Sequence, residues 1–132
     1  MTIGEVSMRT GLPESTLRYY EKKRLIQVPR DKSGRRNYLA SDVEWIRFIR
    51  RLKETGMSLR NIQRYSELRY AGDDTMPERL TMLQSHREYV LEQQQKWAEY
   101  LENLDGKIQI YQQAIISSSS TSDPPSPLCR RT

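Results

Sequence analysis

Residues 2–21 read TIGEVSMRTGLPESTLRYYE, and this stretch decides the fold because it carries signals for two short helices and the turn between them. Thr2 and Glu5 have the spacing of a capping box, which predicts that a helix begins at Ile3. Gly11 stands where that helix must end, since glycine adopts the left-handed backbone conformation without a Cβ clash. These positions predict two helices joined by a tight turn.

The second helix begins after Pro13, which cannot continue a helix but can start one, and we expect it to run over residues 14–22. Leu17 and Tyr20 are three residues apart and face inward. The opposite face carries polar, cationic and aromatic groups suited to touching DNA, namely Ser15, Thr16, Arg18, Tyr19 and Lys22. The pattern predicts a helix-turn-helix whose second helix reads DNA. The alternative is an αα-hairpin with ordinary solvated charges.

A wing follows in residues 30–39, RDKSGRRNYL, where Ser33-Gly34 is a turn signal between two strand-capable arms. The expected tip and return arm carry Arg30, Lys32, Arg35, Arg36 and Tyr38. Cationic side chains on such a tip suit phosphate contact, which positions a protein on DNA without specifying sequence. A solvated loop is the alternative interpretation.

A second helical pair comes next. Ser41 and Glu44 have capping-box spacing, and an apolar stripe follows in Val43, Trp45, Ile46, Phe48, Ile49 and Leu52. Thr55-Gly56 stops this helix, and Ser58 can cap the next one, whose inward residues are Leu59, Ile62, Tyr65 and Leu68. The helix start at Ser58 and Arg60 is a natural phosphate site, because free backbone N–H groups and the helix dipole favour an anion there.

Charge is divided unevenly along the chain. Residues 1–70 contain 16 Lys and Arg against 8 Asp and Glu, a balance of +8, whereas residues 71–116 contain 4 against 8, a balance of −4. A basic half followed by an acidic half indicates a module that binds a polyanion, joined to a segment with a different role.

The second half has the pattern of a coiled coil. Positions three and four apart form a seam from Leu80 to Ile115, and the apolar members expected to dimerise are Leu80, Leu83, Val90, Trp97, Leu101, Leu104, Ile108 and Tyr111. We expect one helix over residues 77–116, and a narrow seam on a single helix requires a partner. The flanking positions carry few charges, so the sequence leaves both a parallel and an antiparallel partner open.

Composition excludes several classes of protein. With 36% hydrophobic and 30% charged residues, a large ligand-enclosing core is not expected. The single cysteine, Cys129, rules out a disulfide within the chain and a cysteine-based zinc site. No catalytic constellation appears, and the lone His86 has no other ligands around it in the sequence. We therefore expect no enzyme activity, metal, cofactor or membrane segment, and a cytoplasmic location.

Two long segments carry a family resemblance: residues 2–26, TIGEVSMRTGLPESTLRYYEKKRLI, and residues 33–62, SGRRNYLASDVEWIRFIRRLKETGMSLRNI. They resemble the DNA-binding domain of the MerR family of bacterial transcription regulators. The resemblance implies a mainly α protein, with a winged helix-turn-helix domain followed by a long helix that dimerises as an antiparallel coiled coil. By position it implies DNA contacts from Arg18, Tyr19, Arg36, Tyr38 and Arg60. It also implies a homodimer on double-stranded promoter DNA that acts on RNA polymerase indirectly, by distorting the DNA.

The predicted organisation has three parts. Residues 1–72 form the DNA-binding domain, residues 73–116 form a linker and the dimerisation helix, and residues 117–132 form a disordered tail rich in Ser and Pro.

The resemblance points to no particular effector. Metal-sensing relatives use cysteines near the end of the dimerisation helix, where this chain has none, and thiol-stress-sensing relatives have a cysteine where Arg51 stands. Two alternatives to a promoter regulator remain, an excisionase-like protein that bends DNA and a coiled-coil adaptor whose basic half meets an acidic protein. The long seam counts against the former, and affinity for duplex DNA would count against the latter.

Overall fold

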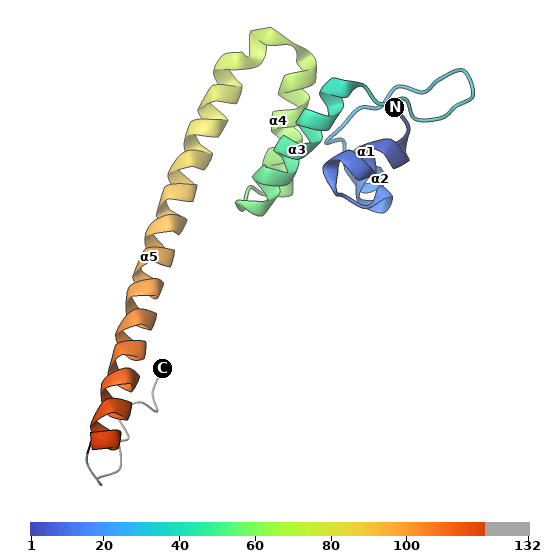
Figure 1. Cartoon of the computed structure of the whole chain (residues 1–132). Coiled ribbons are helices and arrows are strands. Elements are labelled where there is room, and N and C mark those ends of the chain that lie inside the picture. The colour runs from blue at the N-terminus through green and yellow to red at the C-terminus, as the bar shows by residue number, and fades with distance from the viewer. Residues whose placement is uncertain (121–132) are drawn as a thin grey trace. The chain divides into compact units, whose positions relative to one another are not determined.

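The computed structural model describes residues 1–120, and the chain is mainly α-helical over that range. Its elements are α1 (Ile3–Thr10), α2 (Glu14–Lys22), α3 (Ala40–Glu54), α4 (Leu59–Ala71), the short 3-10 helix η1 (Asp73–Thr75) and α5 (Met76–Ser120) (Figure 1). The chain divides into a compact unit, Met1–Glu88, and a second unit from Tyr89, which within the described range is the remainder of α5.

The predicted start and end of α1 are confirmed. The Glu5 backbone N–H donates to Thr2 Oγ1 at 3.2 Å, and the Thr2 N–H donates to Glu5 Oε1 at 3.2 Å, so both halves of the capping box form. The Glu5 carboxylate accepts hydrogen bonds from the Thr2 backbone N–H and from the Thr2 hydroxyl, and these two bonds, the backbone one above all, lower the pKa of Glu5. Gly11 has a φ of 73° and donates its N–H to Ser7 O at 2.9 Å, which closes the helix.

Gly11 gives a stability test with a built-in control. Gly11→Ala places a Cβ in a left-handed conformation and is expected to lower the free energy of unfolding by about 1–2 kcal/mol. Gly106→Ala, in the interior of α5 with no neighbouring atom near a new Cβ, is expected to raise it by roughly 0.5–1 kcal/mol. Urea unfolding followed by circular dichroism measures both. Equal effects of the two substitutions would contradict the assignment of Gly11 as the helix stop.

The capping box predicted for the first helix of the second pair, Ser41 with Glu44, is wrong. The helix α3 begins at Ala40, so Ser41 lies inside it, and Glu44 pairs instead with Arg47 at 2.6 Å. Asp42 performs the capping, because its carboxylate accepts the Leu39 backbone N–H at 2.7 Å. The cap predicted for α4 is confirmed, since Ser58 Oγ accepts the Asn61 N–H at 3.2 Å.

The core of the first unit lies between the two helical pairs. Its centre consists of side chains with little or no exposed surface, among them Val6, Leu17, Tyr20, Leu25, Ile46, Ile49 and Ile62. Trp45 of α3 stacks on Tyr65 of α4 with ring centroids 5.7 Å apart. Its indole N–H donates to the Leu25 carbonyl at 3.0 Å, and the Ser66 hydroxyl donates to the same oxygen. One carbonyl after α2 is therefore held by both α3 and α4.

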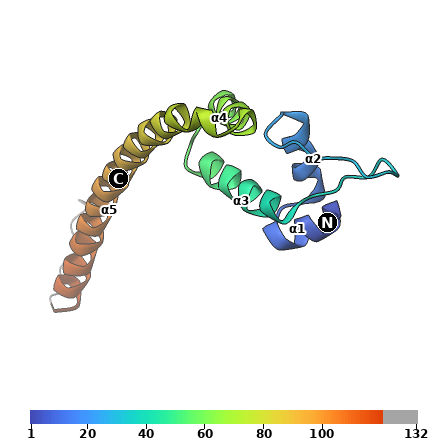
Figure 2. The same ribbon diagram turned by 90° about the horizontal axis from the view of Figure 1, so that it is seen from above.

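The wing is a loop rather than a two-stranded hairpin. Within the described residues no regular strand forms, and the arms of the wing meet in a single antiparallel bridge between Arg30 and Arg36. Asp31 orders the tip, because its Oδ1 accepts the backbone N–H groups of Ser33 at 2.8 Å and Arg35 at 3.0 Å. In both views the loop extends away from α1 and α2 (Figures 1 and 2).

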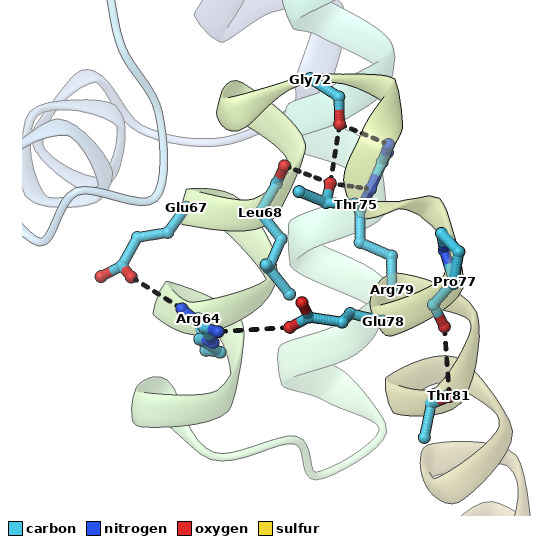
Figure 3. A network of polar contacts seen from close by, with 9 residues as sticks. All are labelled: Arg64, Glu67, Leu68, Gly72, Thr75, Pro77, Glu78, Arg79 and Thr81. Carbon is cyan, nitrogen blue, oxygen red and sulfur yellow. Dashed lines mark hydrogen bonds and ion pairs between the residues drawn. The ribbon is translucent and has the colours of Figure 1, made fainter.

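A polar network builds the joint between α4 and the first turn of α5 (Figure 3). The Thr75 hydroxyl contacts the carbonyl oxygens of Leu68 at 2.5 Å and Gly72 at 2.7 Å. Arg79 donates to Thr75 Oγ1 at 3.0 Å and to Gly72 O at 3.3 Å, and Arg64 of α4 pairs with Glu78 at 3.2 Å. Thr75 thus binds a carbonyl group in the last turn of α4, and with Arg79 it binds the carbonyl group of Gly72, which follows that helix, while the Arg64–Glu78 pair joins the two helices through side chains.

The helix α5 is longer than expected. It has 45 residues, about 68 Å at roughly 1.5 Å per residue, and it continues to Ser120 rather than ending at Ile116. Residues 117–120, predicted as the start of a disordered tail, are therefore helical, and the rest of that predicted tail lies outside the described residues. Within residues 1–120, no helix is both long and apolar enough to cross a bilayer.

Much of the predicted seam is exposed on the single chain. Leu80, Trp97, Leu101, Leu104, Ile108, Tyr111 and Ile115 are each between 44% and 69% exposed. Leu83 differs, because it packs against the core of the first unit. Val90 is partly buried.

Candidate nucleic-acid interface

The outer face of α2 is arranged as the sequence predicts. Buried Leu17 and Tyr20 hold the helix to the core, while Ser15, Arg18, Tyr19 and Lys22 are exposed and Thr16 is partly buried. Arg18 pairs with Glu14 one turn earlier, at 3.3 Å, with both side chains about half exposed. Such an exposed ion pair contributes little free energy, so Arg18 can exchange this partner for a base edge or a phosphate.

Two lysines flank the ring of Tyr19. Lys23 lies 5.7 Å from the ring centroid, and Lys53, which comes from the end of α3, lies 5.4 Å from it. Lys53 also lies 5.2 Å from the ring centroid of Tyr20. Lys53 was not among the residues predicted from the sequence. The only sequence feature that could have pointed to it is its place two residues before the Thr55-Gly56 helix stop. Both lysines add positive charge beside the exposed face of α2.

Glu21 joins the wing to α2. Its Oε1 accepts a hydrogen bond from Arg36 Nε at 2.8 Å, and Arg30 Nη2 lies 3.3 Å from both of its carboxylate oxygens. The Glu21 and Arg36 side chains are 21% and 27% exposed, so this pair is better shielded from solvent than the Arg18–Glu14 pair. Glu21 is a second residue that sequence reasoning missed, because nothing in the sequence brings position 21 to the base of the wing.

Tyr38 corrects the expectation for the return arm of the wing. Its side chain is 1% exposed and belongs to the core, and its hydroxyl has no hydrogen-bond partner in the described part of the chain. In this conformation it cannot make the expected phosphate contact. Burial raises the pKa of Tyr38, so the hydroxyl stays protonated at neutral pH.

A cationic hollow separates the wing from the start of α1. It has a volume of about 430 Å³ and is lined by Thr2, Ile3, Arg30, Gly34, Arg35 and Arg36. Arg35 is exposed, and it forms no side-chain ion pair with any residue from 1 to 120. The lining has the charge and the openness that suit a phosphate group.

The start of α4 also remains accessible. Ser58 and Arg60 are both exposed, as a phosphate contact at this helix start requires. The residues predicted to bind DNA thus lie in three places, on α2, on the wing and at the start of α4. Tyr38 lies on the wing as well, but its side chain is buried. In the described part of the chain, no group of three or more His, Cys, Asp or Glu side chains is placed to hold a metal ion.

Comparison with known proteins identifies related sequences. A family model described as MerR HTH family regulatory protein matches residues 1–68, and a second, described as MerR, DNA binding, matches residues 43–107. An uncharacterized HTH-type transcriptional regulator of Haemophilus influenzae is 36% identical over 114 residues, covering 86% of this chain and 84% of that protein. The HTH-type transcriptional regulator AdhR of Bacillus subtilis is 38% identical over 93 residues, covering 70% of this chain and 66% of AdhR.

Solved structures agree with these sequence relatives. HiNmlR, a MerR family regulator lacking the sensor domain and crystallised bound to promoter DNA, superposes with a TM-score of 0.78 at 35% identity, over 87% of this chain and 92% of that one. A MerR family regulator from Listeria monocytogenes superposes with a TM-score of 0.85 at 31% identity, over 91% and 92% of the two chains.

Proposed function

The chain belongs to the MerR family of helix-turn-helix regulators, and from this premise we propose that it is a sequence-specific transcription regulator that binds promoter DNA as a homodimer. One observation carries the proposal: α2 exposes Arg18, Tyr19 and Lys22 on one face, beside a wing that presents further arginines. HiNmlR, similar over most of its length, is bound to promoter DNA. The protein would act in the cytoplasm, where bacterial DNA lies, and without catalysis.

We assign the two tasks to different parts of the chain. Residues 1–72 would hold DNA, with α2 in the major groove and the wing and the start of α4 on the backbone. Residues 73–116 would supply the dimer contact through the exposed seam of α5, in the antiparallel arrangement that the family resemblance implies. The net balance of +8 over residues 1–70 favours this division, because phosphate neutralisation needs the basic charge in the part that contacts DNA.

Arg18 and Arg36 are expected to act differently on DNA, and this difference tests the proposal. Arg18→Ala should cost about 1–3 kcal/mol and relax the sequence preference at one position in each half-site, because a bidentate contact with a base edge is lost. Arg36→Ala should weaken binding to all sequences alike and reduce the slope of log affinity against log salt by roughly one. The measurement is affinity across a library of duplexes derived from the preferred genomic site.

The two substitutions control for each other, since each removes one guanidinium from the same module. If both lower affinity uniformly across the library, α2 is not the helix that reads sequence. If the wild-type protein itself shows no preference among genomic fragments, an excisionase-like bending protein becomes the better assignment.

A further inference from the structure

We propose that Glu21 is a positioning residue for DNA binding, whose carboxylate holds the wing arginines in the orientation in which they meet the phosphate backbone. This inference rests on the proposed function and adds a residue that would touch no DNA itself. Its premise is a juxtaposition: one carboxylate on the reading helix α2 contacts Arg36 at 2.8 Å and Arg30 at 3.3 Å.

The two arginines lie at the base of the wing, on opposite arms. They form the single backbone bridge that closes the loop, so Glu21 holds both arms at the point where they meet. No regular ladder supports the wing within the described residues. Asp31 orders the tip, and the end of the return arm is held by buried Tyr38 and by hydrogen bonds from the Met1 ammonium group to Asn37 and Tyr38. Glu21 acts at a different point, because its carboxylate links α2 to both arms where they bridge.

The geometry also decides which part of Arg36 remains available. Arg36 uses Nε toward Glu21, and its two terminal nitrogens make no hydrogen bond with residues 1–120. A guanidinium presents its donors in a fixed planar fork, so anchoring the Nε side sets the direction of the terminal pair. Arg36 lines the cationic hollow beside the wing, where a phosphate oxygen would meet those nitrogens.

This role has a counter-intuitive consequence for affinity. A carboxylate on a DNA-facing helix repels phosphate, so simple electrostatics predicts that Glu21→Gln tightens binding. If Glu21 orients the wing, its removal instead frees two long side chains and the loop that carries them, and ordering them again on DNA costs free energy. The two explanations therefore predict changes of opposite sign in the DNA affinity of Glu21→Gln.

Glu14 provides a matched control. It lies on the same helix, carries the same charge and pairs with one arginine, but that partner is one turn away on α2 and not on the wing. Glu14→Gln is expected to tighten binding to a fluorescein-labelled, mixed-sequence DNA duplex by about two- to threefold at low salt, because it removes repulsion and releases Arg18 from an exposed ion pair. Glu21→Gln is expected to weaken binding to the same duplex by about three- to tenfold and to lower the salt slope, because fewer phosphate contacts form.

A double substitution separates positioning from general stability. In the background Arg30→Ala with Arg36→Ala, Glu21 has no guanidinium to orient, so Glu21→Gln should now tighten binding as Glu14→Gln does. Circular dichroism melting confirms that each variant is folded at the assay temperature. If Glu21→Gln is not folded there, Glu21→Asp replaces it, and this shorter carboxylate should give an affinity between those of the wild type and of Arg36→Ala.

The outcomes are distinguishable. If Glu21→Gln, or Glu21→Asp where it is used, binds as tightly as the wild type or tighter, the carboxylate is not a positioning group. If Glu21→Gln weakens binding equally in the double-arginine background, its effect does not pass through the wing, which also overturns the inference. If the wild type and Glu14→Gln both fail to bind the duplex at low salt, the proposed function fails instead.

Discussion

The double substitution Leu101→Asp with Leu104→Asp is expected to convert the protein to monomers and to remove most of its affinity for its DNA site. Both side chains lie on the predicted seam, and they are 58% and 57% exposed in the single chain. Burying a leucine contributes roughly 1.5–3 kcal/mol, and a homodimer contains each position twice. Because a little over half of each residue is exposed before association, the loss is about 3–7 kcal/mol per dimer, or about two to five decades in the dimer dissociation constant, before the added cost of burying carboxylates.

Analytical ultracentrifugation measures the assembly state, and DNA affinity measures the consequence. A matched pair on α5 supplies the control. Ile108, on the seam, and Ile110, off it, have similar exposure at 47% and 44%. Ile108→Asp should weaken the dimer strongly, whereas Ile110→Asp should leave it nearly intact. An unchanged dimer in the double variant, or equal effects at positions 108 and 110, would place the interface elsewhere.

The second large effect concerns the promoter. We propose that the dimer binds a pseudo-palindromic site in a spacer between promoter elements that is too long for RNA polymerase, and that its active state kinks and untwists this DNA. Such deformation costs on the order of 1–10 kcal/mol, which contacts from α2, the wing and the start of α4 in two protomers can offset. Deleting about one or two base pairs from the centre of the spacer should then activate the promoter without the protein, because the elements are already aligned.

A reporter gene in cells that lack the protein measures this effect. The same deletion immediately outside the promoter elements is the control, since it removes as much DNA without changing their separation. With the original spacer, transcription should rise only when the protein is present in its active state. A shortened promoter that stays silent, or a binding site outside the spacer, favours simple repression or an architectural role.

Local signals explain why much of the fold could be predicted from the sequence. Thr2, Gly11 and Pro13 act through hydrogen bonds and backbone angles within a few residues, and the structure has α1 and α2 where these residues predict them. The start of α3 shows the limit of such reasoning. The stretch Ser41-Asp-Val-Glu44 offers two acidic side chains, and only the folded backbone selects Asp42 as the partner of the Leu39 N–H.

The exposure of the candidate DNA-binding residues was predictable where they lie on one helix, and it was unpredictable where it depends on contacts between segments distant in the sequence. Periodicity separates Arg18 and Tyr19 from Leu17 and Tyr20 on α2. No periodicity is available in a loop, so Tyr38 could not be recognised as a core residue. Glu21 and Lys53 act across 15 and 34 positions of sequence, to Arg36 and Tyr19 respectively, and only tertiary packing brings them there.

If the exposed seam of α5 joins two protomers as we propose, it also determines how the protein responds to its own abundance. If two protomers must associate before DNA is held firmly, occupancy of the site below the dimer dissociation constant rises with the square of the protomer concentration. A twofold change in synthesis would then change occupancy about fourfold in that regime. The apolar surface that Leu101, Leu104 and Ile108 bury on association would set the dimer dissociation constant. Gene dosage that keeps the protomer concentration well below this constant would then leave the promoter largely unoccupied.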